Sequence, residues 1–324
     1  GRFLARHQDD NGKFAYTVKG PSGQYGSGYN FPRHAGTAGF MAHLANRTQD
    51  PEVLESAEKS IEFIVANTTH LDDGRAYFQD SRRSDGMAWV GTTSLAALAL
   101  AEQNHPLAKE FGRFLASAID DRGQVLGEMD RVSGTFSPQQ QNPYGQGQTL
   151  LALAVLVNAG HEELRPAMAR TAAFVDGDYS PHAAGRLVVL DEHWACLAAL
   201  ALQDAQEAPA GRSLCLAYLD DSTPNIPTVS DVLQPSAGAA GGLAEAVVAG
   251  ALLDPEGPWR DQAMAYGRLF LRSSYQSKDA AFLPQPDRLM GGLRDTPVRL
   301  DVRMDAVQHI GFALLGIEAL LRAG

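Results

Sequence analysis

Cysteine is scarce in this chain: its 324 residues include only Cys196 and Cys215. So few cysteines exclude both a disulfide-rich secreted scaffold and a zinc site built from several thiolates. The most apolar stretches are interrupted by Gln, Glu or Gly before they reach the ~18–20 residues that cross a bilayer, so no membrane insertion is expected. The first residues also lack the charged start and apolar core of a secretion signal. The sequence does not indicate in which cellular compartment the protein is found.

Basic residues are in the minority as well. The chain has 27 Lys and Arg against 38 Asp and Glu, a formal net charge of −11. Nucleic acids and anionic membranes need a basic face, so we expect neither as a partner. The sequence also lacks the phosphate-loop, HExxH and Gly-x-Ser-x-Gly motifs, which removes three common kinds of active site.

A repeated pattern dominates what the chain does contain. Six segments rich in Ala and Leu each follow a polar or aromatic cluster, and they begin near residues 34, 89, 145, 193, 238 and 308. These segments are apolar on nearly every side, which indicates helices buried on several sides. Between them lie amphipathic stretches such as residues 51–65, whose acidic face is typical of a solvated outer helix.

This alternation predicts an all-α fold with six inner helices and an outer layer. We expect an (α/α)6 toroid that forms one domain over residues 1–324, with short β-hairpins or extended loops at one end. Tight turns are predicted where glycine follows a polar pair, at Gly12, Gly74 and Gly123. An open helical solenoid remains the structural alternative, because repeats alone do not reveal whether the ring closes.

The repeat also predicts where a site lies. Inner helices of an alternating ring all point the same way, so their amino ends gather at one end of the barrel. The helix dipoles there favour anionic or hydroxyl-rich ligands, and aromatic and amide side chains suit a polyhydroxylated ring. The expected partner is therefore a glycan or another small polar substrate. The predicted substrate-binding residues are Tyr29, Arg33, Asp85, Trp89, Tyr144, Gln146, Trp194, Arg303 and Gln308.

Acids and histidines at the same helix starts are candidates for catalysis. Chemistry at a sugar carbon needs an acid and a base, which are most often carboxylates, with His as an alternative. The predicted catalytic residues are Asp191, Glu192 and Asp305, with His34, His193 and His309 as alternates. Asp85, Asp191 and Asp305 are equally typical of first-turn acids that complement a helix dipole. Arg33 and Arg303 suit a bidentate contact with a carboxylate, such as that of a uronic acid.

Metal chemistry is the alternative to metal-free acid–base catalysis. No cofactor is expected, but His34, His193 and His309 are enough ligands for a catalytic divalent metal ion. Cys196 follows Glu192 by one helical turn, so a nucleophilic or metal-ligating cysteine is a further alternative to a buried structural thiol. Cys215 lies in an apolar segment and is interpreted as a core residue.

Three motifs connect this layout to known proteins. They are YNFPRHAGT at 29–37, YGQGQ at 144–148 and DAVQH at 305–309. With the repeat, they resemble the six-hairpin, (α/α)6-toroid superfamily of carbohydrate-active proteins, which includes glycosidases, unsaturated glucuronyl hydrolases, polysaccharide lyases and the helical domain of glucuronyl C5-epimerases. The resemblance implies a hydrolase or a lyase/epimerase acting on an acidic or hydroxyl-rich glycan. A metal-dependent enzyme that modifies a peptide or small molecule and a non-catalytic binding toroid remain alternatives.

Overall fold

The computed structural model describes residues 1–79, 84–138, 144–177, 193–205, 211–222, 236–296 and 298–323. The chain divides into two compact units. Unit 1 comprises Gly1–Ser60 and Ser222–Gly324, and unit 2 comprises Ile61–Asp221. Each unit is mainly helical. That the chain forms one domain stays a prediction.

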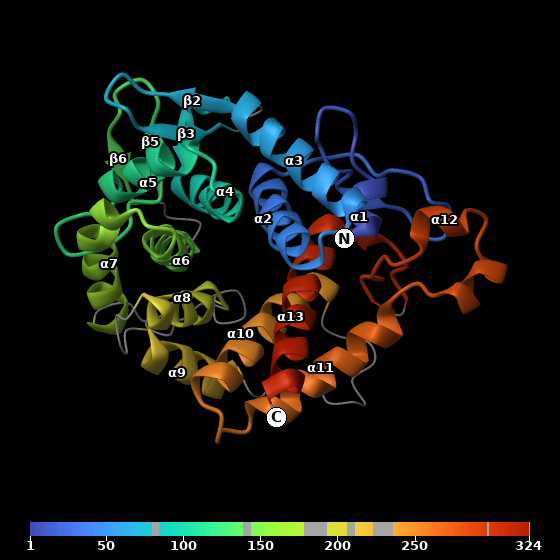
Figure 1. The fold of residues 1–324 in the computed structure, drawn as a ribbon. Helices are drawn as coiled ribbons and strands as arrows, with labels where there is room; N and C mark the ends of the chain where they lie inside the picture. Colours follow the sequence, from blue (N-terminus) through green and yellow to red (C-terminus); the bar gives the residue numbers. More distant parts are fainter. Residues whose placement is uncertain are drawn as a thin grey trace. The chain divides into compact units, whose positions relative to one another are not determined.

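Unit 1 is built around three apolar helices. Its helices are α1 (Arg2–Arg6), α2 (Phe31–Thr48), the first part of α3 (Pro51–Ala66), α10 (Ala237–Leu253), α11 (Trp259–Ser273), the 3-10 helix η5 (Ser277–Phe282), α12 (Pro286–Leu289) and α13 (Met304–Ala323). Helix α13 packs against both α2 and α10, and α11 covers α10 and α13 (Figure 1). The predicted starts near 34, 238 and 308 thus correspond to α2, α10 and α13.

Small residues allow these three helices to approach closely. A β-carbon added to Gly36 of α2 would lie 2.9 Å from Gln308 Oε1, and one added to Gly241 of α10 would lie 2.7 Å from the β-carbon of His309. Both distances are shorter than ordinary van der Waals contact. The flexible Gln308 side chain can move away from a residue larger than Gly36. A residue larger than Gly241 would instead push α10 away from α13, because the backbone nitrogen of Ile310 is also only 3.1 Å away.

Two short strands of unit 1 connect segments that are distant in the sequence. Strand β1 (Thr17–Val18) pairs antiparallel with β7 (Val302–Arg303), so that Thr17 lies opposite Arg303. The backbone amide of Met304, the first residue of α13, donates a hydrogen bond to the carbonyl of Tyr16 at 3.2 Å. This pairing fixes the chain on either side of the α13 start.

Unit 2 repeats the alternation of buried and covering helices. Its helices are the end of α3, α4 (Val90–Glu102), α5 (Leu107–Ser117), α6 (Gly145–Asn158), η1 (Glu162–Leu164), α7 (Arg165–Gly177), α8 (His193–Asp204) and α9 (Arg212–Ser222). Helix α6 packs against α4 and α8, while α5 covers α4 and α6, and α7 covers α6. These inner helices begin close to the predicted positions 89, 145 and 193.

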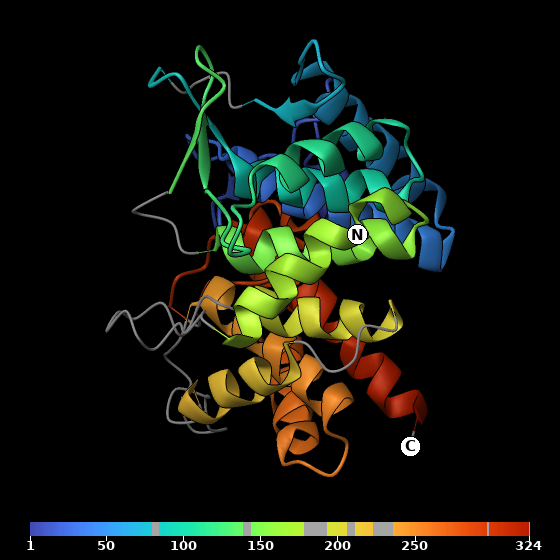
Figure 2. The same cartoon turned by 90° about the vertical axis from the view of Figure 1, so that its left-hand side faces the viewer.

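Short strands precede or link the helices of unit 2. They are β2 (Thr68–His70), β3 (Ala76–Phe78), β4 (Met87–Trp89), β5 (Glu128–Asp130) and β6 (Phe136–Ser137). Strand β2 pairs with β3, and β5 lies between β4 and β6, all antiparallel. Figure 2 shows the β5–β6 hairpin standing out from the helices. The predicted turn glycines Gly12, Gly74 and Gly123 have positive φ angles of 81°, 78° and 93°, which glycine adopts without steric cost.

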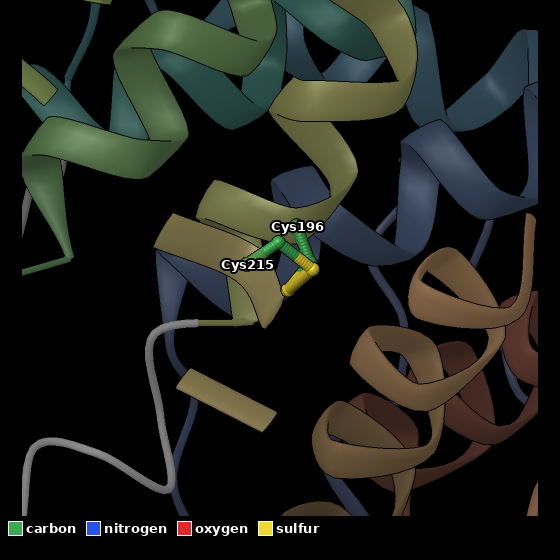
Figure 3. The surroundings of a disulfide bond; sticks show 2 residues. All are labelled: Cys196 and Cys215. Carbon is green, nitrogen blue, oxygen red and sulfur yellow. A yellow bond between two sulfur atoms is a disulfide. The ribbon is translucent and has the colours of Figure 1, made fainter. Parts of the chain in front are cut away.

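A disulfide bond joins two helices of unit 2. Cys196 of α8 and Cys215 of α9 are both fully buried, and their sulfur atoms are bonded (Figure 3). The sequence analysis interpreted the two cysteines separately and missed the pair. A bonded sulfur is neither a nucleophile nor a metal ligand, so the catalytic alternative for Cys196 is wrong.

One helix bears on the expectation that no segment inserts into a membrane. Among the described residues, Met304–Arg322 is the single stretch long and apolar enough to cross a bilayer. Half of that stretch is buried inside the protein. Its contacts with α2, α10 and α11 are those of a core helix, and a core helix meets the same length and hydropathy criteria.

Candidate active site

The start of α2 positions two of the predicted residues of unit 1. The side chain of Asn30 accepts a hydrogen bond from the backbone amide of Arg33 at 3.0 Å and caps the helix. His34 is fully buried, and its Nδ1 lies 2.6 Å from the hydroxyl of Tyr29. Burial lowers the pKa of His34 to about 3, although a hydrogen bond with the backbone of Ser60 opposes this. The imidazole is therefore neutral near pH 7.

Arg33 and Arg303 converge on one carboxylate at the start of α13. Arg33 Nε lies 2.8 Å from Asp305 Oδ2, and Arg303 Nε donates to Asp305 Oδ1 at 3.1 Å. Arg33 also donates to the hydroxyl of Tyr16, next to strand β1. We call Arg33, Arg303 and Asp305 the arginine–aspartate cluster. The structure thus brings together three predicted residues from two separate segments of the chain.

The cluster is charged on its exposed side. The side chain of Asp305 is 7% exposed, against 39% for Arg33 and 31% for Arg303. Burial alone would raise the pKa of Asp305, but the hydrogen bond from Arg303 and the charges of both arginines outweigh it and hold that pKa below its ordinary value. Asp305 is therefore an ionised carboxylate near pH 7, and the side chains of both arginines are partly exposed.

A second pair of titratable groups lies one turn further along α13. His309 Nδ1 is 2.7 Å from Glu245 Oε2 of α10, and Gln308 Nε2 is 3.3 Å from the same nitrogen. The side chain of Glu245 is 1% exposed and that of His309 is 16% exposed. The buried carboxylate thus orients an imidazole that still reaches the surface.

The two pKa values of this pair depend on each other. Burial would lower the pKa of His309, but the charge and hydrogen bond of Glu245 outweigh burial and raise it above its ordinary value. Burial raises the pKa of Glu245, and His309 opposes that rise only in part. An imidazole held in place by a carboxylate is suited to general acid–base catalysis.

The remaining predicted residues that the structure describes belong to unit 2. Gln146 of α6 accepts a hydrogen bond from the backbone amide of Val125 and donates one to the carbonyl of Gly123, so both ends of its amide serve the local backbone. Asp85 accepts from the amide of Met87 in an exposed turn. His193 and Trp194 start α8 with ring centroids 4.4 Å apart. Trp89 ends β4 and Tyr144 precedes α6. Their part in substrate binding stays a prediction.

Two predicted acids cannot be placed, and two residues of the site were not predicted. Asp191 and Glu192 lie outside the described residues. Glu245 and Tyr16 were missed by sequence reasoning. Glu245 could have been found, because it is the one charged residue in the apolar stretch 237–253. Tyr16 carries no such signal, since its contact with Arg33 depends on tertiary structure.

Comparison with known proteins gives strong similarity in structure and little in sequence. No protein-family model and no curated protein sequence match the chain. A cellobiose 2-epimerase from Spirochaeta thermophila aligns with a TM-score of 0.67 and 13% identity, over 98% of this chain and 94% of that chain. A D-mannose isomerase aligns with a TM-score of 0.70 and 10% identity, over 98% and 96%. An α-mannanase from Bacteroides thetaiotaomicron aligns with a TM-score of 0.66 and 10% identity, over 99% and 94%.

These alignments cover nearly the whole of both chains and decide the fold class. The chain has the (α/α)6-toroid fold. The fold class predicted from the sequence is confirmed, and so is the resemblance to toroid carbohydrate-active proteins at the level of fold. At sequence identities of 10–13%, the similarity establishes the fold and not the reaction. One such fold hosts different reactions, so function has to be argued from the site.

Proposed function

We propose that the protein is a carbohydrate-active enzyme that moves a proton at a carbon atom of a sugar, in the manner of an epimerase or an aldose–ketose isomerase. The observation that carries the proposal is the contact between His309 and the buried Glu245, 2.7 Å apart, which holds an acid–base group at the surface of unit 1. An epimerase and an isomerase among the proteins of the same fold support this choice.

The chemistry assigns a role to each group. A base removes the proton from C2 of an open-chain aldose, and the electron pair forms an enediolate whose negative charge rests on the C1 oxygen. His309 is the proposed base. Once the enediolate has turned to present the other face of C2, return of the proton to C2 gives the epimer. If the proton of the C2 hydroxyl first moves to the C1 oxygen, return of the proton to C1 gives the ketose. Glu245 holds the ring of His309 in place through the contact with Nδ1.

The state of the carboxylates in unit 1 disfavours glycoside hydrolysis. A two-carboxylate hydrolase needs one protonated acid and one free carboxylate on either side of the glycosidic bond. Asp305 is bound by two arginines that favour its ionised form, and Glu245 is occupied by His309. Proton transfer by the imidazole of His309 needs neither a protonated Asp305 nor an unpaired Glu245.

Exchange of hydrogen with solvent tests the proposal directly. D-Mannose, D-glucose and cellobiose are incubated with the protein in D2O, and loss of the C2 proton signal is followed by NMR. We expect exchange with at least one sugar and a loss of about a hundredfold or more in His309→Asn, because general acid–base groups contribute roughly 10²–10⁴ in rate.

A matched control separates the acid–base role from general damage. His70 and Glu110 form a similar pair at 2.8 Å, but both are exposed. His70→Asn should exchange at the wild-type rate. The proposal is refuted if His309→Asn retains full exchange while folded, or if hydrolysis of a glycan proceeds without any exchange at C2.

A metal ion is the alternative that the sequence analysis retained. In unit 1, Glu245 and His309 would offer a carboxylate oxygen and an imidazole nitrogen to a divalent cation. Catalytic zinc commonly takes three protein ligands, so Glu245 and His309 would need a third. Elemental analysis of the purified protein distinguishes the metal enzyme from metal-free acid–base catalysis. A stoichiometric transition metal that is lost in Glu245→Gln would favour the metal enzyme.

A further inference from the structure

We propose that the sugar handled by this protein carries a carboxylate group, bound by Arg303 and Arg33 beside the amino end of α10. The inference rests on the proposed function, because it names the substrate class of the same site. The observation that carries it is the unequal pairing in the arginine–aspartate cluster, where two arginines share one carboxylate.

Among the described residues, the charges of the cluster itself do not cancel. Asp295 also acts on Arg303, but it pairs with a further arginine, since Arg299 Nη1 lies 3.8 Å from Asp295 Oδ2. Glu245 is paired with His309. By themselves, Arg33, Arg303 and Asp305 leave one positive charge in excess.

This excess charge is accessible. About a third of each arginine side chain is exposed, 39% for Arg33 and 31% for Arg303, while Asp305 is almost covered. An arginine has five N–H donors, and contacts with Asp305 use only part of them. The outer donors can bind a second planar carboxylate in a bidentate manner, which a neutral hydroxymethyl group cannot match.

The amino end of α10 adds to the attraction. A β-carbon on Gly238, in its first turn, would lie 3.9 Å from Arg303 Nη2 and 4.0 Å from Asp305 Oδ2, so this turn borders the cluster. The N-cap residue Ser236 makes no side-chain capping hydrogen bond, and Gly238 and Ala239 are half-buried. The amide of Ala237 donates to the carbonyl of Asp295 at 2.8 Å, so it is the helix dipole that favours an anion at this place.

One net positive charge matches a carboxylate better than a phosphate. A carboxylate has a single negative charge and two coplanar oxygens that fit a guanidinium group. A phosphate monoester carries between one and two negative charges near neutral pH, which the cluster would compensate less completely. The inference therefore commits to a sugar acid.

Two sugars that differ at one carbon test the inference. D-Mannuronic acid and D-mannose share the same ring and the same C2–H, but C6 is a carboxylate in one and a hydroxymethyl group in the other. We expect kcat/KM for C2 exchange to be at least about tenfold higher for D-mannuronic acid, because a charge-assisted hydrogen bond is stronger than one to a neutral hydroxyl group. Arg303→Gln should reduce this preference about tenfold.

The exposed Arg322 provides the control. Arg322→Gln removes a positive charge from the last turn of α13, where Arg322 pairs with Glu318 and its side chain is 71% exposed, so the preference should stay within about twofold of wild type. Arg303→Lys keeps the charge and loses the bidentate geometry, and it should retain part of the preference.

The outcomes separate this inference from the proposed function. Equal exchange of both sugars, or a preference for D-mannose, overturns the inference and leaves the proposed function standing. A preference for D-mannose 6-phosphate over the acid also overturns it, since the anion is then not a carboxylate. No exchange with any sugar refutes both. The wild-type comparison needs no variant, so misfolding of Arg303→Gln leaves the inference open to refutation.

Discussion

Glu245 Oε2 and His309 Nδ1 are 2.7 Å apart, although 64 positions separate the two residues in the sequence. The carboxylate is buried in a helix that is otherwise apolar, so it is retained at the cost of desolvating a charged group. The imidazole partner offsets part of this cost. Glu245 thus positions the ring of His309 and raises its pKa.

The first prediction concerns how activity depends on pH. Glu245 raises the pKa of His309, and a base must be unprotonated, so kcat/KM should rise with pH through that raised pKa. In Glu245→Gln the carboxylate charge is lost while burial remains, so the pKa of His309 falls. We expect the midpoint of the rising limb to move to lower pH by about one unit or more.

Exchange rates measured between pH 4.5 and 9 provide the check. Glu110→Gln, which removes the acid of the exposed His70 pair, should leave the profile in place. A Glu245→Gln midpoint equal to that of wild type, or higher, would show that Glu245 does not set the pKa of His309.

The second prediction concerns the close approach of α10 and α13. The β-carbon of Gly241→Ala would meet the β-carbon of His309 at 2.7 Å and the backbone nitrogen of Ile310 at 3.1 Å. Because backbone cannot move aside as a flexible side chain can, we expect destabilisation by about 1–3 kcal/mol and a loss of exchange activity. Urea unfolding and C2 exchange measure the two effects.

A glycine in a neighbouring helix serves as the control for this substitution. A β-carbon on Gly267 of α11 would lie 3.4 Å from Ile317, an ordinary contact. Gly267→Ala should stabilise the protein by about 0.5–1 kcal/mol through helix propensity. If Gly241→Ala and Gly267→Ala changed stability and exchange activity equally, neither property would depend on the close approach of α10 and α13.

The third prediction concerns the disulfide. The bond between Cys196 and Cys215 closes a loop of 19 residues, so it restricts the unfolded chain. Removing it in the Cys196→Ala, Cys215→Ala double variant should lower the free energy of unfolding by about 3 kcal/mol. Dithiothreitol should lower the urea midpoint of the wild type and leave that of the variant unchanged. A wild-type midpoint that does not respond to reductant under unfolding conditions would count against the bond.

The fourth prediction concerns Asp305. Asp305→Asn leaves two guanidinium groups without their shared carboxylate, so we expect a loss of about 1–3 kcal/mol in stability at pH 7. The folded pKa of Asp305 is below the unfolded value, so its contribution is complete above the unfolded pKa of about 3.9 and is lost as pH falls through the folded pKa. The difference in free energy of unfolding between wild type and variant should therefore be the same at pH 7 and pH 5. It should disappear in stronger acid.

Thermal and urea unfolding at each pH measure this gap. Glu55→Gln removes an exposed acid that pairs with Lys59 within one helix, and it should cost no more than about 0.5 kcal/mol. A gap that widens below pH 4 would contradict the assignment.

The helices could be predicted because their signal is local. Apolar periodicity and the clusters before each buried helix give starts near 145, 193 and 238, and the structure begins α6, α8 and α10 at Gly145, His193 and Ala237. The segment between α11 and α13 was not predicted to contain η5 and α12. It is polar and has no apolar period that would indicate a helix.

The site could be predicted only in part because side-chain partners are set by tertiary structure. Arg33, Arg303 and Asp305 were identified by their places at helix starts, but nothing in the sequence shows that both arginines bind the same carboxylate. Glu245 was missed because its surroundings resemble a core helix. The cysteine pair was missed because a spacing of 19 residues does not tell which helix faces bring the two sulfur atoms together.

The pairing of β1 with β7 has a consequence for how the protein is made. Arg33 is synthesised long before Arg303 and Asp305. The arginine–aspartate cluster therefore cannot assemble until translation has passed residue 305. The contiguous residues 61–221 emerge complete well before that moment and can fold first. A messenger truncated before α13 would therefore yield a chain whose middle part is structured and in which Arg33 and Glu245 have not met their partners on α13.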